Sequence, residues 1–332
     1  MKRTLVLLML VATPAFAQTL EDPMAPSPIP QGTGDDAVSV SAEIFGTGRR
    51  DDAYGAFQRG YFLTALQLAL PRAEANDAAA QTLIAEIYAR GLGVSENLAR
   101  ASGWYAIAAK NGDVLAAFEL GMLYLDGNGV PRNPAKAADL FKQAADKGYA
   151  AAEYNLALLH VEGRYLRPDL SEAARLMKAA ADKDLASAQY DYGSMLIEGA
   201  GVPPDAAAGA RYVGLAAKQG LIAAMVDYAT LLYLGQGIAK NLEEAVGWYR
   251  SAAESGNAVA QVRLGKLMAV GEGTDFDLTH AAMWRALARR QGYSDPQLDK
   301  LLASISAADL AAAEELARFW PSEPPKAESA GG

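Results

Sequence analysis

The chain has 332 residues, of which 51% are hydrophobic and 21% are charged, and this composition excludes a wholly disordered chain. Its 30 basic and 39 acidic side chains give a net charge of −9, so we expect no nucleic acid partner. Because the chain contains no cysteine, disulfides, thiolate catalysis and cysteine-ligated metals are excluded as well.

The first 17 residues have the pattern of a cleavable export signal. Lys2 and Arg3 precede an apolar run, and Ala15 and Ala17 form the small-residue pattern that signal peptidase recognises before Gln18. The run is shorter than the roughly 20 apolar residues that a membrane span needs. We therefore expect cleavage between Ala17 and Gln18, a periplasmic or secreted mature chain, and no membrane insertion after cleavage.

Two segments have the composition of disordered chain. Residues 18–50 are rich in proline and glycine and show little apolar periodicity, which predicts a disordered linker. Residues 321–332 predict a disordered tail for the same reason. The folded part should therefore lie between these two segments.

From residue 78 the sequence repeats every 36 residues. A turn glycine recurs at this interval, with an alanine eleven residues before it and a glycine or alanine six residues before it. Six residues after each glycine comes Asn or Asp, the residue types that cap the first turn of a helix. The turn glycines are Gly91, Gly127, Gly163, Gly199, Gly235 and Gly271, and the predicted caps are Asn97, Asn133, Asp169, Asp205, Asn241 and Asp277.

Each unit is predicted to contain two antiparallel helices joined by a Gly-x-Gly turn, near 79–90 and 97–111 in the first full copy. One unit cannot bury its apolar face alone, so successive units should stack into an all-α solenoid with a continuous core. Two further helices within 293–320 should cap its end. The residues expected to fill the space between units are Trp104, Leu140, Leu176, Tyr212, Trp248 and Trp284.

The motif Ala-x-x-x-Leu-Gly-x-x-Tyr-x-x-Gly-x-Gly-Val, read from Ala116 to Val130, resembles the Sel1-like repeat family, a relative of the tetratricopeptide repeats. The resemblance covers 78–292 in six copies, and 51–77 resembles an N-terminal tetratricopeptide-type unit. It implies a right-handed superhelix whose concave surface is lined by the first helix of each unit. The third copy departs from the pattern, because Tyr165 replaces the second turn glycine and Asp184 replaces the terminal glycine.

No catalytic, cofactor or metal site is predicted. The Gly-x-Gly turns lack the preceding strand and the Lys-Ser/Thr pair of a phosphate-binding loop. The capping Asn and Asp residues lie one repeat apart, too far to share a metal ion. His160 and His280 are interpreted as structural or solvated residues.

A partner-binding surface is predicted on the first helices, at positions that the repeat does not need for its core. These positions carry aromatic and apolar side chains with an acidic edge, which suits an extended or helical peptide with basic residues. The same side chains could instead be buried between repeats, because periodicity does not separate groove from core. The candidate residues are Phe118, Met122, Asp126, Tyr154, Leu158, Glu162, Tyr190, Glu198 and Tyr233.

These patterns favour a non-enzymatic exported adaptor that binds a protein or peptide partner through the solenoid surface, in envelope or signalling regulation. The resemblance also suggests an alternative, a peptidoglycan or cell-wall ligand binder with weak hydrolase or β-lactamase-like activity. Cysteine-rich relatives suggest that activity, and this chain lacks their cysteine pairs.

Overall fold

The computed structural model describes residues 51–163 and 165–322, which belong to one compact unit that starts at Asp51. The predicted export signal and linker lie outside the described residues, as does the predicted tail from residue 323 onward. All regular secondary structure within the described ranges is helical. The predicted all-α class is confirmed.

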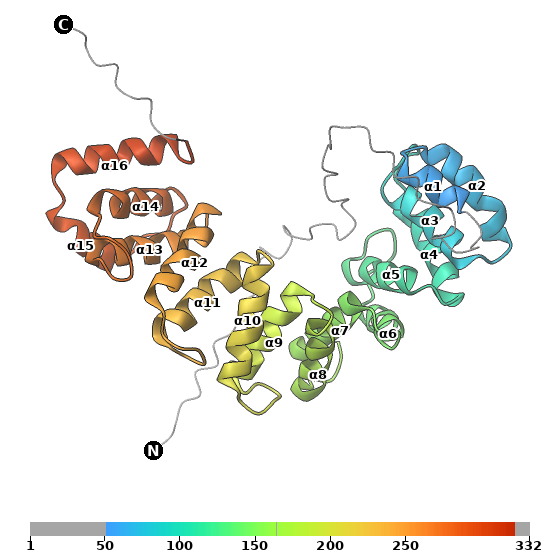
Figure 1. Ribbon diagram of the computed structural model, residues 1–332. Coiled ribbons are helices and arrows are strands. Elements are labelled where there is room, and N and C mark those ends of the chain that lie inside the picture. Colours follow the sequence, from blue (N-terminus) through green and yellow to red (C-terminus); the bar gives the residue numbers. More distant parts are fainter. Residues whose placement is uncertain (1–50, 164, 323–332) are drawn as a thin grey trace, which may run out of the picture. The chain divides into compact units, whose positions relative to one another are not determined.

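The described residues form sixteen α-helices and a short 3-10 helix at Leu302–Ser304, in the order shown in Figure 1. The α-helices are α1 (Asp52–Gln58), α2 (Phe62–Glu74), α3 (Ala78–Ala89), α4 (Leu98–Lys110), α5 (Val114–Asp126), α6 (Pro134–Ala145), α7 (Ala150–Glu162), α8 (Leu170–Ala181), α9 (Ala186–Glu198), α10 (Ala206–Lys218), α11 (Ile222–Leu234), α12 (Leu242–Glu254), α13 (Ala258–Val270), α14 (Leu278–Arg290), α15 (Pro296–Leu301) and α16 (Ala307–Phe319).

Helices that follow one another in the sequence pack against one another from α1 to α14. Six pairs, from α3 with α4 to α13 with α14, form the repeats, and the second helix of each pair packs on the first helix of the next. Beyond the last pair, α15 packs on α13 and α16 packs on α14. The chain is therefore a solenoid, and its buried side chains pass from repeat to repeat.

The predicted caps lie at the start of each second helix. The side chain of Asn97 accepts a hydrogen bond from the Arg100 N–H, and Asp277 accepts one from the His280 N–H. The four predicted caps between them, Asn133, Asp169, Asp205 and Asn241, each accept the same bond. The N-capping interpretation is confirmed.

The glycine turn is explained by close approach between repeats. A Cβ on Gly201, the second turn glycine after α9, would lie 2.1 Å from the Leu170 carbonyl oxygen at the start of α8. A side chain at this position cannot be accommodated in that geometry. In the third repeat Tyr165 takes this place, and Arg132 Nη1 donates to its hydroxyl at 3.0 Å.

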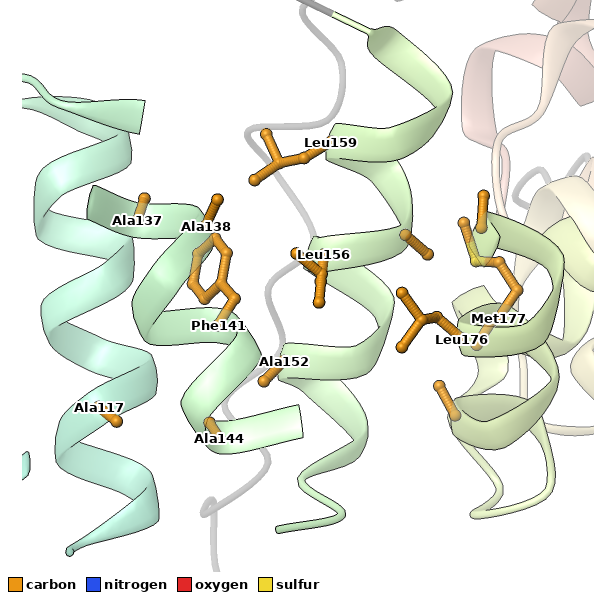
Figure 2. Packing of buried hydrophobic residues seen from close by; sticks show 14 of the residues in the cluster. Ala117, Ala137, Ala138, Phe141, Ala144, Ala152, Leu156, Leu159, Leu176 and Met177 are labelled. Carbon is orange, nitrogen blue, oxygen red and sulfur yellow. The ribbon is translucent and has the colours of Figure 1, made fainter. Parts of the chain in front are cut away.

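Small residues and one large side chain per repeat form the core. Figure 2 shows Phe141 on α6 with Ala137, Ala138 and Ala144 of the same helix. Its ring packs on α5, where it lies 5.7 Å from the Phe118 ring. Of the residues predicted to fill the space between units, Leu176, Tyr212 and Trp284 are buried, whereas Trp104, Leu140 and Trp248 are only half-buried. In those three repeats the residue one position later is the more buried one, because its side chain packs on the first helix of its own repeat. These residues are Tyr105, Phe141 and Tyr249.

A buried glutamine connects successive repeats at three places. Gln81 Nε2 donates to the Ala73 carbonyl at 2.8 Å, and its Oε1 accepts from Asn111 Nδ2 at 2.9 Å. Gln189 and Gln261 make the same two bonds. Each donates to a carbonyl at the end of the preceding helix and accepts from a glutamine amide just after the following helix. Each glutamine thus satisfies a carbonyl at the end of one repeat and an amide at the end of the next.

Glu153 stands at the glutamine position in the third repeat. Its Oε1 accepts from Lys183 Nζ at 2.6 Å, which replaces the amide pair of the other repeats by an ion pair. Its Oε2 is buried and finds no hydrogen-bond partner among the described residues. A carboxylate cannot donate to a carbonyl, so this oxygen is left unsatisfied where glutamine would donate.

Gly121→Ala should lower the free energy of unfolding by about 1–3 kcal/mol, because the added Cβ would lie 2.6 Å from the ring of the fully buried Phe141. Gly247→Ala in α12 is the matched control, since its Cβ would meet nothing within 4 Å. That variant should raise the free energy of unfolding by about 0.5–1 kcal/mol through helix propensity. Urea unfolding followed by circular dichroism measures both, and a change of the same sign would contradict this account.

Glu153→Gln should raise the free energy of unfolding by about 1 kcal/mol, because the new Nε2 can donate to the Ala145 carbonyl while Oε1 still accepts from Lys183. Glu153→Ala removes both roles and should destabilise the chain. The two variants are compared by the same urea titration. Destabilisation by the glutamine would show that the charge of the ion pair outweighs the unsatisfied oxygen.

Candidate functional site

The candidate partner-binding residues lie on α5, α7, α9 and α11, the first helices of repeats two to five. We call this surface the first-helix face. Asp126, Glu162 and Glu198 are exposed, and each is the last residue of its helix. The half-buried members are Phe118 and Met122 on α5, Tyr154 and Leu158 on α7, Tyr190 on α9 and Tyr233 on α11.

The half-buried side chains take part in both the core and the surface. The Phe118 ring lies 5.7 Å from the Phe141 ring and 5.1 Å from the Tyr149 ring, between centroids. Met122 and Leu158 also pack against the same cluster of buried residues. Groove and inter-repeat core were left as alternatives by the sequence, and each of these side chains packs on one side and meets solvent on the other.

Two tyrosine hydroxyls bridge consecutive first helices. Tyr154 of α7 donates to Asp191 Oδ2 of α9 at 2.9 Å, and Tyr190 of α9 donates to Asp227 Oδ2 of α11 at 2.7 Å. Both pairs are 37 residues apart, one more than the repeat, so each aspartate directly follows the next repeat's equivalent of the tyrosine. That spacing is present in the sequence, yet only the packing shows that the pair meets.

Burial and charge determine the ionisation of this network. Burial raises the pKa of Tyr154, and the neighbouring Asp191 carboxylate raises it further. Tyr190 shows the same upward shift, caused by burial and then by Asp227. Burial also raises the pKa of Asp191, although the hydrogen bond from Tyr154 acts in the opposite direction. The tyrosines therefore stay protonated and remain donors at neutral pH.

The third tyrosine of the face is anchored differently. Tyr233 donates to Glu272 Oε2 at 3.1 Å, and Lys240 Nζ lies 5.4 Å from the centre of its ring. The hydrogen bond to Glu272 raises the pKa of Tyr233, and burial adds to it. Each tyrosine of the face is thus held by a carboxylate from the following repeat.

The acidic edge is opposed to local helix electrostatics. A helix carries partial negative charge at its C-terminus, where cations are favoured and carboxylates are unfavourable. Asp126, Glu162 and Glu198 nevertheless occupy that end in three consecutive repeats, and none of them forms an ion pair within the described ranges. Three carboxylates therefore lie along this edge of the first-helix face, with Arg132 beside Asp126 and Glu162.

A cavity of about 360 Å³ opens between the ends of α5 and α7. Leu125, Leu158 and Leu159 supply apolar walls, and Asp126 and Glu162 lie at its rim. Arg132, Asn155 and Tyr165 complete the lining, and the sequence did not single out Arg132 or Asn155. The Arg132 guanidinium donates two hydrogen bonds, from Nε to the Leu125 carbonyl at 2.8 Å and from Nη1 to the Tyr165 hydroxyl. Six of the eight lining residues thus lie on α5 and α7, and three of them, Asp126, Leu158 and Glu162, belong to the first-helix face.

The histidines and acidic groups give no further chemistry. His280 Nδ1 lies 2.6 Å from the capping Asp277, and His160 Nδ1 is buried without a partner among the residues that the structure describes. Within 51–163 and 165–322, no group of three His, Asp or Glu side chains is placed to hold a metal ion. No helix in these ranges has both the length and the apolar character needed to cross a bilayer.

The fold and this face define a helical-repeat scaffold built from 36-residue helix-turn-helix units. The model of the Sel1 repeat matches residues 78–113, 114–149, 150–185, 186–221, 222–257 and 258–293. The chain belongs to the Sel1 repeat family. The resemblance that the motifs suggested is therefore confirmed. No curated protein matches this chain.

Solved structures that are similar to this chain include two with 28% sequence identity. One is a protective antigen present in uropathogenic Escherichia coli strains that displays an SLR fold, with 28% identity and a TM-score of 0.68. The similarity covers 76% of this chain and 55% of that protein, so this chain spans about half of its length. The other is a Sel1 repeat protein from Oxalobacter formigenes, with 28% identity, a TM-score of 0.63, and coverage of 72% of this chain and 97% of that one.

Asp191→Asn should stabilise the chain at neutral pH, and the gain should shrink as the pH is lowered. Because the folded-state pKa of Asp191 is raised, the wild-type chain loses stability as the pH rises from the ordinary aspartate range through the raised value. An asparagine oxygen can accept the Tyr154 hydrogen bond without carrying a charge. Urea unfolding at several pH values between about 4 and 7 measures the difference. A gain that is independent of pH would refute the assignment to Asp191 ionisation.

Proposed function

We propose that this chain is a non-enzymatic adaptor that binds a protein or peptide partner rich in basic residues through the first-helix face. The observation that carries the proposal is the row of anchored tyrosines on α7, α9 and α11 beside carboxylates at the ends of α5, α7 and α9. Sel1-repeat proteins typically mediate protein–protein interaction and are generally non-catalytic, which supports the same class of function.

Anchored aromatic rings are suited to peptide recognition. The hydrogen bonds to Asp191, Asp227 and Glu272 fix the tyrosine hydroxyls, so the rings lose little additional conformational entropy on binding. A bound segment could then rest on ring faces and on the half-buried Met122 and Leu158. This arrangement supplies the apolar part of the contact.

The carboxylates supply selectivity for charge. Asp126, Glu162 and Glu198 recur at intervals of one repeat, so a segment that crosses α5, α7 and α9 meets one carboxylate at each helix end. Lysine or arginine side chains would neutralise these groups and also the negative helix ends. The cavity beside Asp126 and Glu162 is large enough to receive one such side chain.

We also propose that the mature chain works outside the cytoplasm, in the periplasm or as a secreted protein, in envelope or signalling regulation. The pattern of the first 17 residues supports export. Intact-mass analysis of the chain from cell fractions tests it, since a mature N-terminus at Gln18 in the extracytoplasmic fraction is expected. No contact or cavity described above favours the cell-wall hydrolase alternative.

Charge reversal of the acidic edge tests the binding proposal. Random peptides displayed on phage are selected against the immobilised full chain, and the enriched peptides are expected to be rich in Lys and Arg. The triple variant Asp126→Lys, Glu162→Lys, Glu198→Lys should weaken their binding by about tenfold or more in fluorescence anisotropy. All three residues are exposed, so the helical circular dichroism should be unchanged.

The matched control carries the same change in charge elsewhere. The triple variant Asp139→Lys, Glu314→Lys, Glu315→Lys alters exposed residues on α6 and α16 and should bind the same peptides as the wild-type chain does. If both triple variants lost the same amount of peptide affinity, the loss would be explained by the change in net charge alone. Failure to enrich any basic peptide would refute the first-helix face as a peptide site.

A further inference from the structure

A second surface with the opposite charge lies on α10, the second helix of the fourth repeat. A cavity of about 240 Å³ opens there between α10, Tyr228 of α11 and the turn after α11. Arg211 and Lys218 lie at its edge and are exposed, as is Leu215 between them. The chain has a net charge of −9, so a surface with two cations beside an apolar hollow differs in charge from the chain as a whole.

Small residues of α10 line the hollow. Gly214 stands where Lys142, Lys178 and Arg250 stand in repeats two, three and five, whereas the first and sixth repeats have alanine. The ring of Tyr228 fills the position of the missing side chain, since a Cβ on Gly214 would lie 2.8 Å from it. Ala207 and Ala210 leave the remaining space open.

The third repeat shows how the same surface is neutralised elsewhere in this chain. Arg175 pairs with Glu172, three residues before it, at 2.7 Å. Lys178 pairs with Asp182, four residues after it, at 2.5 Å. Both cations of α8 thus form ion pairs with acids close to them in the sequence.

The fourth repeat keeps one of these two cations, lacks both acids and has a lysine in place of one of them. Arg211 occupies the place of Arg175, but Ala208 stands where Glu172 would be. Lys218 occupies the place of Asp182, and Gly214 the place of Lys178. Neither Arg211 nor Lys218 makes an ion pair with any residue in 51–163 or 165–322, and Asp182, near Arg211, is already bonded by Lys178 and Tyr212.

We propose that this face of α10 docks an acidic amphipathic helix of a partner protein. Arg211 and Lys218 are seven residues apart, two helical turns or about 10 Å along one side of α10, with Leu215 between them. A partner helix with carboxylates at positions i and i+7 and an apolar side chain between them matches this spacing. Its carboxylates pair with the two cations, and its apolar side chain covers Leu215 and enters the hollow.

This surface is separate from the first-helix face in position and in the charge it selects, so either can fail without the other. The probe is an acetylated and amidated synthetic helix with Glu at i and i+7 and Leu at i+4. One comparison peptide has the same composition in scrambled order, and a second has Lys in place of both Glu residues. In fluorescence anisotropy, the full chain should bind the probe and neither comparison peptide. Added salt should weaken this binding.

Substitutions on α10 give the sharpest readout. Arg211→Glu with Lys218→Glu should weaken the probe by about tenfold or more, because both cations become repulsive. Ala208→Glu gives Arg211 the acid that Arg175 has and should weaken binding while leaving both cations in place. Lys110→Glu, at the same repeat position as Lys218 but on α4, should bind as the wild-type chain does.

Three results would overturn the proposal. The probe could fail to bind the wild-type chain, could bind the scrambled peptide equally well, or could bind the Arg211→Glu, Lys218→Glu variant with unchanged affinity. Binding to phosphatidylserine vesicles that is lost in the same variant, without peptide binding, would instead assign this surface to a membrane. The substituted residues are exposed apart from the half-buried Ala208, so circular dichroism and melting temperature should match the wild-type chain.

Discussion

The close approach of neighbouring helices at small residues is the constraint on which the structure depends. Ala116, Ala152, Ala188 and their equivalents are fully buried, and turn glycines such as Gly201 leave no room for a side chain. Large residues pack on these small ones, as Phe141 of α6 does on Gly121 of α5, and another face of each repeat meets the next repeat. A single pair of helices would leave that face exposed, so each repeat is stable only beside its neighbours. After 36 residues the chain has formed two helices and a turn, and the same contact between helices occurs again.

Polar contacts between repeats vary within this constraint. Buried glutamines join repeats at Gln81, Gln189 and Gln261, and Glu153 replaces them by an ion pair with one unsatisfied oxygen. Tyrosine–carboxylate bonds join α7 to α9, α9 to α11, and α11 to the turn after α13. The third repeat therefore differs from its neighbours in its turn, its buried polar residue and its cavity, while its helices keep the common packing.

Two surfaces of opposite charge are formed by residues that the core does not bury. On the first helices, carboxylates lie at C-termini, where helix electrostatics disfavours them. On α10, cations lack the acids that neutralise the equivalent surface of α8. In both places the sequence departs from what local stability alone would select, and such departures are expected at binding surfaces. A scaffold with an acidic face and a basic face is suited to holding two different segments at once.

The helix-turn-helix unit, the caps, the turn glycines and the solenoid can all be predicted from the sequence. Each of these depends on neighbours within one repeat or on an interval of 36 residues, so periodicity and capping chemistry are sufficient. The sequence also identified the aromatic and acidic residues of the first helices. The packing of the helices was needed to show that Tyr154 meets Asp191, that Phe141 rather than Leu140 is fully buried, and that Arg211 and Lys218 border a hollow. These outcomes depend on which of two apolar helix sides meets the next repeat and at what distance, and a period alone does not contain that information.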